Sequence, residues 1–379
     1  MRRVRVCFVV SSPYTISSFL KNHIIELSKE YDIYVVGNFE QNNIKKLAIL
    51  PVKEFKNIAL HRDINLWFDF KALFSLYIYF KARRFDVVHS VTPKAGLLAM
   101  ISSRLISVKT RIHIFTGQVW SNKTGLIRNI LMFLDKVIIW CSTDILVDSF
   151  AQRNFLIKSG VLNQSKGIVL GKGSISGVDI NKFQHDKLVR DSLRLQMNIG
   201  DDEIVFVFVG RLNRDKGVLD LVKAFNKLMI DYKSVSLMLV GHEEESIIQE
   251  IKSLTNGSHK IIFYGFTTEP AKVLMACDIF CLPSYREGFG TSVIEASSCG
   301  KPIICSDTEG LADTILDNVT GIRHQVSDVD SIYEAMKKLI NDPSLREKMG
   351  VEGRKFVTSH FRAKHVTDCW IEFYKTKVN

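Results

Sequence analysis

The chain has 379 residues, a length typical of two domains or one large one, so a small scaffold held by disulfides or a structural metal is excluded. With 46% hydrophobic and 24% charged residues, the composition is that of a globular protein. The net charge is +11, and residues 1–175 hold 25 Lys or Arg against 11 Asp or Glu, whereas residues 176–379 hold 26 against 29. A basic first half fits nucleic acid, an anionic membrane surface or a phosphorylated substrate.

The seven cysteines are odd in number and stand mostly inside apolar runs, which favours reduced core thiols in a cytosolic protein. The alternative is a zinc site made from four of them, Cys277, Cys281, Cys299 and Cys305. These four lack the C-x2-C spacing of a zinc knuckle, so we favour the core thiols. No signal peptide is visible, and the longest apolar stretches, 65–80 and 127–141, are interrupted by charged residues. We expect any membrane contact to be peripheral.

Short β-branched runs alternate with longer amphipathic stretches in the first half. The expected strands are 4–10, 33–36, 87–90, 111–115, 145–147 and 168–170. Continuous apolar strands separated by helical segments indicate a parallel sheet that is covered on both faces. Three glycines between Gly171 and Gly177 then break the pattern, and a charged segment without strand character, 181–202, follows. We therefore predict an N-terminal domain over 1–172 and a C-terminal domain over 173–360.

The alternation restarts in the second half. The expected strands are 203–209, 236–240, 261–264, 279–282, 302–305 and 321–323, with helices near 219–230, 244–253, 269–277 and 292–299. The predicted fold class is therefore α/β, with two doubly wound, Rossmann-like domains. Ligands of such sheets bind at the carboxyl ends of the strands, so we expect a site in a cleft between two facing domains. A C-terminal helix within 361–379 either crosses back to the first domain or caps its own.

The most informative segment is 285–296, which follows an expected strand and opens an expected helix. Its glycines, Gly288 and Gly290, let backbone amides approach a phosphate at the positive end of that helix. Glu287 lies in the turn and Glu295 lies about two turns into the helix, so both carboxylates face one site at different depths. Carboxylates bind hydroxyl groups rather than phosphate. Two of them beside an anion-binding turn suit a nucleotide sugar.

A second segment, 209–217, also lies between an expected strand and an expected helix. Its Arg211 and Lys216 would converge on the same site as two fixed cations that neutralise a departing diphosphate. A solvated basic loop is the alternative interpretation. The presence of both segments at strand ends of one domain favours a site.

These residues carry a resemblance to a known family. The two glutamates separated by seven residues, the Gly-Arg…Lys-Gly loop and the Gly177-Val178-Asp179 linker together resemble family 4 of the retaining glycosyltransferases, whose two-domain fold is named GT-B. The resemblance covers nearly the whole chain and is strongest over 171–302. With a Thr-Gly-Gln-Val-Trp run at Thr116–Trp120, it extends to bacterial enzymes that make capsule and O-antigen precursors.

The resemblance implies a role for each matching residue. Glu287 would hold hydroxyls of the donor sugar and support the developing oxocarbenium ion, and Glu295 would bind the ribose. Arg211 and Lys216 would hold the diphosphate leaving group in place of a metal, so no metal and no other cofactor is expected. Further donor contacts are implied along the turn and at the base, at Gly288, Phe289, Gly290, Gly265, Phe266 and Thr267. Front-face attack by the acceptor hydroxyl would retain the configuration without a separate catalytic base.

The N-terminal domain departs from the family pattern in two places. The loop after the first strand has no glycine, and the hydroxyls of Ser12 and Thr15 stand in that loop instead. At the end of a later strand, Thr116 precedes Gly117 where the family has a histidine that meets the 6-hydroxyl of the donor. His113 lies on the opposite face of that strand, where we expect it to pack in the core. The substitution predicts a donor without a 6-hydroxyl, such as an N-acetylated 6-deoxyhexose.

The basic first half has its own candidate partners. Thr92 and Lys94 follow an expected strand and begin a helix, where they could hold an anionic acceptor head. Basic residues also follow the aromatic stretch 67–80, and Arg128 begins another apolar helix. This pattern is typical of an interfacial anchor on anionic lipid, with core helices that have ordinary solvated faces as the alternative. We expect a cytoplasmic protein, peripheral at the inner face of a bacterial inner membrane.

The predicted function is transfer of a hexose from a UDP-sugar to a lipid-diphosphate-linked, lipopolysaccharide or capsule precursor. One alternative is a UDP-sugar 2-epimerase of the same fold, but the extra carboxylates and histidine of that chemistry do not stand out. A nucleic-acid-binding protein would need a recognition module that the sequence lacks, so no nucleic acid partner is expected. A dinucleotide oxidoreductase would need Gly-x-Gly-x-x-Gly after the first strand, and the loop there has no glycine, so this class is not favoured.

Overall fold

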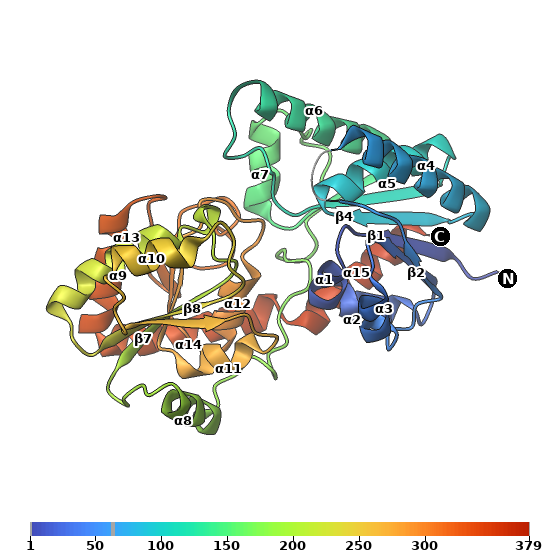
Figure 1. Cartoon of the computed structure of the whole chain (residues 1–379). Helices are drawn as coiled ribbons and strands as arrows, with labels where there is room; N and C mark the ends of the chain where they lie inside the picture. The colour runs from blue at the N-terminus through green and yellow to red at the C-terminus, as the bar shows by residue number, and fades with distance from the viewer. Residues whose placement is uncertain (1, 62–64, 379) are drawn as a thin grey trace. The chain divides into compact units, whose positions relative to one another are not determined.

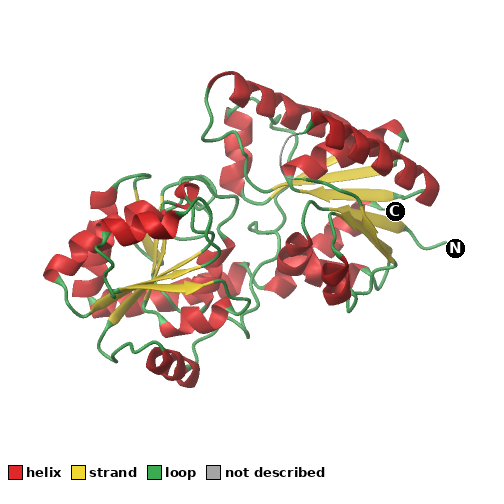
Figure 2. Cartoon of the chain, viewed as in Figure 1, coloured by secondary structure: helices red, strands yellow, loops and turns green. Residues whose placement is uncertain are grey.

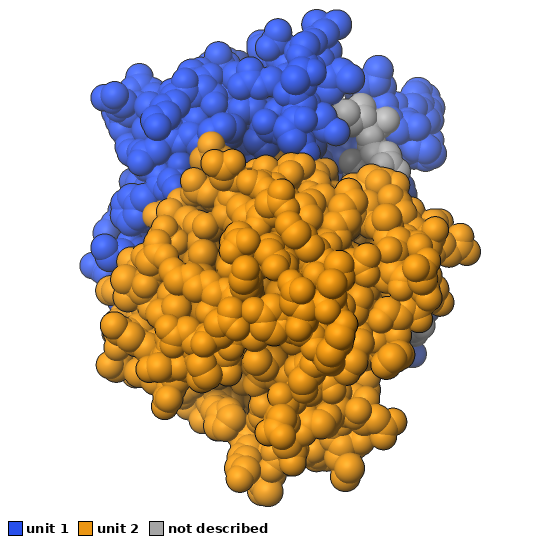
Figure 3. Space-filling view, turned by 90° about the vertical axis from the view of Figure 1, so that its left-hand side faces the viewer, with its two compact units in different colours: residues 1–177, 363–379 blue, residues 178–362 orange. Residues whose placement is uncertain are grey.

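A computed structural model describes residues 2–61 and 65–378. The chain divides into two compact units, which Figure 3 colours separately: residues 1–177 with 363–379, and residues 178–362. This division falls after Gly177, beyond the predicted boundary after Lys172. The C-terminal helix α15 (Ala363–Lys377) belongs to the first unit, so that unit is discontinuous in the sequence.

The first unit is built on a six-stranded parallel sheet of order β3-β2-β1-β4-β5-β6. Its strands are β1 (Arg5–Val9), β2 (Asp32–Gly37), β3 (Glu54–Asn57), β4 (Val87–Val91), β5 (Thr110–Phe115) and β6 (Asp144–Val147). The prediction of a strand at 168–170 is wrong, because this segment forms an isolated β-bridge, from Ile168 to Leu146, in place of a strand. The edge strand β3 was not predicted, because half of its short run is polar and exposed.

Helices cover both faces of this sheet (Figures 1 and 2). They are α1 (Pro13–Thr15), a π-helical turn (Ile16–Leu20), α2 (Lys21–Leu27), α3 (Gln41–Leu47), α4 (Leu66–Arg83), α5 (Pro93–Leu105), α6 (Gly125–Cys141), α7 (Phe150–Lys158) and α15. Along β1, Cys7 and Val9 join one core with α4, α5 and α6, whereas Val6 and Phe8 join another with α2 and α15. Successive strand residues point to opposite faces, so α4, α5 and α6 form one layer and α2 and α15 lie on the other side.

The helix α15 is held by a buried aromatic stack. The ring of Trp370 lies between those of His23 and His89, with centroid distances of 4.2 and 4.9 Å. His23 also bonds through Nε2 to the carbonyl oxygen of Ile175 at 2.6 Å and through Nδ1 to the Thr367 hydroxyl at 3.0 Å. Burial lowers the pKa of His23 to about 4 and that of His89 well below its usual value, so both rings are neutral at pH 7.

The second unit holds another six-stranded parallel sheet, of order β12-β11-β10-β7-β8-β9. Its strands are β7 (Ile204–Val209), β8 (Val235–Val240), β9 (Ile261–Gly265), β10 (Ile279–Leu282), β11 (Ile303–Ser306) and β12 (Gly321–His324). Its helices are α8 (Lys187–Gln196), a 3-10 turn (Arg214–Lys216), α9 (Val218–Asp231), α10 (Ile247–Leu254), α11 (Pro270–Ala276), α12 (Thr291–Ser298), α13 (Val329–Asn341) and α14 (Pro343–His360). The α/β class with two doubly wound units is confirmed.

Two details of the second unit differ from the expectation. The segment 181–202 contains the amphipathic helix α8. Its many charged residues made the helical spacing of its few apolar residues hard to recognise in the sequence. Phe361 does not begin the C-terminal helix: it ends α14 and its ring packs on Phe289, at a centroid distance of 5.3 Å. Within the described residues, no helix combines the length and apolar character that crossing a membrane requires.

Candidate functional site

Two loops meet at the carboxyl edge of the second sheet. Loop 210–217 follows β7 and loop 283–290 follows β10, and these two strands are neighbours. The backbone amide of Tyr285 donates to the carbonyl oxygen of Asp215 at 2.9 Å. Gly217 has a φ of 66°, and a Cβ at this position would clash with the carbonyl oxygen of Pro283. Glycine is therefore required where the second loop rests on the first.

The first predicted cation, Arg211, is paired with a carboxylate. Its Nη1 donates to both carboxylate oxygens of Glu244, at 2.8 and 3.0 Å. The side-chain amide of Asn213 donates to the same carboxylate at 2.7 Å. Glu244 lies in the loop after β8, beside β7, so two adjacent strand ends supply the pair. Arg211 is 44% exposed, which leaves its guanidinium accessible to a ligand.

The second predicted cation, Lys216, forms an ion pair with Glu287. Both side chains are largely covered, with exposed fractions of 17% and 11%. The hydroxyl of Ser284 donates to Oε1 of Glu287 at 2.7 Å and orients this carboxylate. Of the three residues predicted to act on the reacting bond, the structure pairs Lys216 with Glu287, whereas Arg211, on the same loop as Lys216, pairs with Glu244 on the β8 side.

The turn into α12 presents backbone amides. Gly290 has a φ of 64° and is the N-cap of α12, so it has no side chain with which to cap the first helical turn. Free first-turn amides and the helix dipole favour an anion at this end. Phe289 is 5% exposed and its ring lies in the core, so it offers a ligand its backbone and not its side chain. Gly288 is half-buried beside Glu287.

Glu295 lies further along α12. Burial raises the pKa of its carboxyl to about 7, and the nearby Lys182 ammonium opposes this shift. The carboxyl is therefore divided between its ionised and neutral forms near neutral pH. Hydroxyl groups of a ligand that donate to it would favour the ionised form.

The three residues predicted to face the base follow β9, at the same edge of the sheet. The carbonyl oxygen of Gly265 accepts from Gly241 N at 2.9 Å, and the Thr267 hydroxyl accepts from Glu269 N at 3.0 Å. Between them the ring of Phe266 is 65% exposed. An exposed ring at a strand end is a surface on which a planar base can stack.

The predicted residues of the first unit gather at the carboxyl edge of its own sheet. Ser12 follows β1, Thr92 follows β4, and Thr116 and Gly117 follow β5, three adjacent strands. The Ser12 hydroxyl accepts from Tyr14 N at 3.3 Å and so caps α1.

Two hydroxyl groups are in hydrogen-bond contact at this edge, between the ends of β1 and β4. The Thr92 hydroxyl lies 3.0 Å from that of Ser11, and Thr92 itself has a φ of 80°, a strained value for a β-branched residue. Lys94 pairs with Asp69 on α4 at 2.7 Å. His113 is buried and bonds Ser90 at 2.8 Å, which confirms it as a packing residue.

Sequence reasoning assigned no site role to several residues at these edges. Glu244 belongs to an acidic run that directly follows β8, and this position at a strand end was the available signal. Gln118 follows Gly117 and is 2% exposed, yet neither atom of its side-chain amide has a hydrogen-bond partner among the described residues. Nearby, Trp120 Nε1 donates to Asp135 at 2.7 Å, and burial raises the pKa of that carboxyl to about 6.

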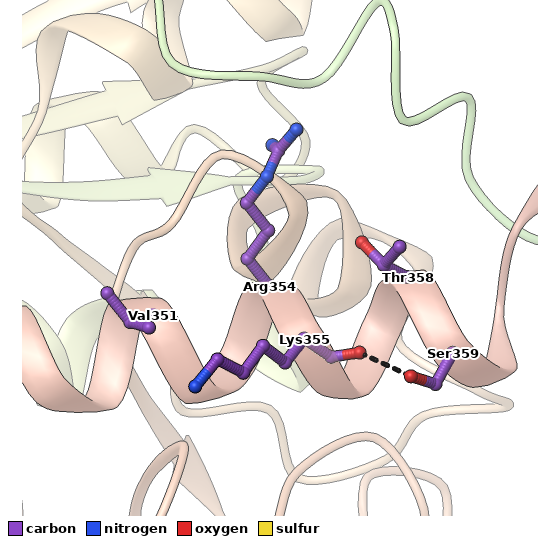
Figure 4. A pocket seen from close by; sticks show the side chains of 5 residues that line it. All are labelled: Val351, Arg354, Lys355, Thr358 and Ser359. Atoms are coloured by element: carbon purple, nitrogen blue, oxygen red, sulfur yellow. Dashed lines mark hydrogen bonds between the residues drawn. The ribbon is translucent and has the colours of Figure 1, made fainter.

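A pocket elsewhere on the second unit is unrelated to these loops (Figure 4). Its lining side chains all come from α14: Val351, Arg354, Lys355, Thr358 and Ser359. The Arg354 guanidinium is engaged with the carbonyl oxygen of Ser298, and the Ser359 hydroxyl donates to its own helix at Lys355 O, at 2.9 Å. None of the predicted site residues lines this pocket.

The chain is similar in sequence to a known family and to characterised proteins. A sequence model of the family "Glycosyl transferases group 1" matches residues 189–356. The capsular polysaccharide biosynthesis glycosyltransferase CapM of Staphylococcus aureus is 29% identical over 92% of this chain and 90% of that protein. The UDP-Gal:alpha-D-GlcNAc-diphosphoundecaprenol alpha-1,3-galactosyltransferase of Escherichia coli is 27% identical over 78% of this chain and 76% of its own.

The fold also matches a solved structure, Anabaena Alr3699/HepE in complex with UDP, with a TM-score of 0.80. The sequence identity is 17%, over 98% of this chain and 100% of that one. The two-unit architecture is therefore that of the GT-B fold. The family match over residues 189–356 and the two relatives support a glycosyltransferase, and the resemblance to the capsule and O-antigen precursor enzymes is confirmed.

Proposed function

We propose that the chain is a retaining glycosyltransferase that moves a hexose from a UDP-sugar to a lipid-diphosphate-linked or lipopolysaccharide or capsule precursor. The observation that carries the proposal is the loop pair of the second unit: Arg211 and Lys216 stand on one loop, and Lys216 pairs with Glu287, three residues before Gly290, the N-cap of α12. Relatives that make capsular polysaccharide, or act on a diphosphoundecaprenol-linked sugar, support this class of acceptor.

The charges of the loop pair suit a diphosphate. In the absence of a donor, Arg211 and Lys216 are each neutralised by a carboxylate. A bound UDP-sugar would bring two phosphate groups to the same cations, and the α12 amides would add hydrogen bonds. Glu287, released from Lys216, would then be free to accept hydroxyls of the sugar. The proposed site needs no metal ion, because these groups supply the positive charge.

The reaction takes place at the anomeric carbon of the donor. Its bond to the diphosphate oxygen breaks, and the electron pair leaves with UDP, whose charge Arg211 and Lys216 stabilise. The acceptor hydroxyl attacks from the face that UDP leaves, and its proton passes to the departing diphosphate oxygen. The new bond forms on that same face, so the configuration is retained. Glu287 stabilises the positive charge that builds up on the sugar ring between the two events.

The remaining contacts refine the substrates. Glu295 would take the ribose hydroxyls, Phe266 would stack on the base, and Thr92 and Lys94 would hold the acceptor head. Thr116 lacks the imidazole that would reach a 6-hydroxyl, which favours an N-acetylated 6-deoxyhexose as the donor sugar. An acceptor anchored by its lipid places the reaction at the inner face of the bacterial membrane.

Radiolabelled transfer tests the proposal. The purified chain is given a panel of UDP-sugars and a lipid-diphosphate-linked acceptor, alongside Lys216→Met and Glu287→Gln. Each substitution is expected to lower kcat/KM by about 100-fold or more. Lys223→Met, which changes a half-exposed lysine on α9 of the same unit, is the matched control and should retain full activity. Full activity in both site variants would contradict the site, and preference for UDP-N-acetylglucosamine over its 6-deoxy counterparts would contradict the donor.

A further inference from the structure

The helices α4 and α6 turn apolar side chains toward solvent as well as toward the core. On the outer face of α4, four of them recur at helical spacing with exposed fractions of 51–65%: Trp67, Phe70, Phe74 and Ile78. On the outer face of α6, the corresponding four are 49–74% exposed: Leu126, Ile130, Phe133 and Trp140. A helix on the surface of a soluble protein normally shows charged and polar residues on this side.

The two outer faces belong to one surface. α4 and α6 both pack on α5 and lie on the same side of the first sheet (Figure 1). Eleven of the 26 large apolar side chains that are exposed among the described residues lie on these two helices. Such a concentration differs from the scatter of single exposed apolar residues that soluble proteins tolerate, and it marks a contact surface. We call it the α4/α6 face.

The segment of the chain that carries the α4/α6 face is predominantly basic. Residues 65–141 contain 11 Lys or Arg and 3 Asp or Glu. Each of the three acids is engaged: Asp69 pairs with Lys94, Asp86 with Arg2, and Asp135 accepts from Trp120.

Basic side chains lie directly on exposed rings of this face. Lys71 Nζ lies 4.9 Å from the Trp67 ring centre, and the Arg104 guanidinium lies 3.9 Å from that of Trp140. Apolar rings with cations beside them suit a headgroup layer of negative charge, in which the rings enter the interface and the cations meet phosphate.

The α4/α6 face begins near the predicted acceptor residues. In a parallel sheet the helix after each strand starts at the carboxyl edge, where Thr92 lies. The Asp69–Lys94 ion pair joins the first turn of α4 to the first turn of α5. The exposed residues Leu66 and Leu126, at the starts of α4 and α6, are 84% and 74% exposed. The apolar surface therefore reaches the edge at which an acceptor head would be held.

We propose that the α4/α6 face docks on the surface of an anionic phospholipid bilayer, with its rings at the level of the headgroups and its basic residues on lipid phosphate. The inference rests on the proposed function, since docking presents the strand ends of the first unit to an acceptor whose lipid is in that bilayer. The occupant is the lipid surface and not a second copy of the chain, because two copies would bring like charges together.

Vesicle co-sedimentation tests the docking. The whole chain is mixed with vesicles of phosphatidylcholine, with and without phosphatidylglycerol, at low and high salt. The docking variant carries Trp67→Gln, Phe74→Gln, Phe133→Gln and Trp140→Gln. Its control carries Leu188→Gln and Leu195→Gln, which change still more exposed apolar side chains on α8 of the second unit. Circular dichroism and thermal unfolding check that both variants fold as the wild type does.

The wild type and the control are expected to bind vesicles that contain phosphatidylglycerol, and to bind less at high salt. The docking variant is expected to lose at least about 30-fold in partitioning. Wild-type binding that does not depend on phosphatidylglycerol, or a docking variant that binds as the wild type does, overturns the proposal. A wild-type dimer in analytical ultracentrifugation that becomes monomeric in the docking variant overturns it in favour of a second copy.

A transfer assay separates this inference from the proposed function. The docking variant should keep activity on a short-chain, water-soluble acceptor within about twofold, and lose it on a long-chain acceptor in vesicles. Equal activity on the two acceptors overturns the docking while the proposed function stands. Vesicle binding without transfer from any UDP-sugar contradicts the proposed function while the docking stands.

Discussion

The stack of His23, Trp370 and His89 predicts that the first unit loses stability in mild acid. His23 is buried, and its neutral ring uses both nitrogens, one to donate to the carbonyl oxygen of Ile175 and one to accept from the Thr367 hydroxyl. A glutamine can offer one donor and one acceptor in the same place but does not titrate. The substitution His23→Gln therefore isolates the cost of protonation.

The magnitude follows from the pKa of His23, which is about 4 in the folded chain against 6.5 for a free histidine. Below pH 6.5 the unfolded chain binds a proton that the folded chain refuses, so stability is present above 6.5 and is lost as the pH falls toward 4. At about pH 5.5 this amounts to about 1.4 kcal/mol for His23 alone. His89 and His113, whose pKa values are also lowered by burial, add to the loss in both proteins.

Urea unfolding followed by circular dichroism measures the effect at about pH 7.5 and 5.5. Between these two conditions the wild type should lose about 1.4 kcal/mol more than His23→Gln. The exposed His259 of the second unit provides the control, and His259→Gln should behave as the wild type does. Equal acid sensitivity in the wild type and His23→Gln would refute the claim that the stack requires a neutral ring.

Three further results are expected. Burial raises the pKa of Glu295 to about 7, so this carboxyl becomes protonated as the pH falls below 7. The KM for the donor should therefore rise by up to about tenfold per pH unit below 7 in the wild type and stay constant in Glu295→Gln. A wild-type KM that does not change with pH would contradict the ribose contact. Gln118→Met, which removes a buried amide without partners, should raise the urea-derived free energy of unfolding by about 1 kcal/mol, and a loss would show that the amide is satisfied. Transfer rates in a chelator should stay within about twofold of those with Mg²⁺, since Arg211 and Lys216 supply the charge.

The sheets could be predicted from the sequence because their central strands are continuous apolar runs. The edge strand β3 could not, since three of its four residues, Glu54, Lys56 and Asn57, are polar and leave one apolar side chain. Helix α8 was missed for a related reason: most of its residues are charged or polar, and it buries only a narrow side. Phe361 was assigned to the last helix, although its aromatic ring belongs to the core of the second unit.

For the site, sequence reasoning identified the groups that lie at strand ends but not their partners. Arg211, Lys216 and Glu287 stood out because glycines and a following helix mark each loop. Glu244 did not, because its partner Arg211 is set by which strand ends are neighbours in the sheet, here β7 and β8. Ser284 stands in the same loop as Glu287, and the folded loop is needed to show that its hydroxyl donates to that carboxylate. The outward rings of α4 and α6 were visible as aromatic stretches, but only the fold shows which of them are left uncovered.

The central claim is that Arg211 and Lys216 exchange their carboxylate partners for the diphosphate of a UDP-sugar. Isothermal titration with UDP tests it most directly, on the wild type, Arg211→Met, Lys216→Met and the control Lys223→Met. The wild type and the control should bind one UDP per chain with equal affinity, and each site variant should bind about 10- to 100-fold more weakly, as expected for a lost charge-assisted hydrogen bond. Equal affinity of all four proteins for UDP would contradict the account.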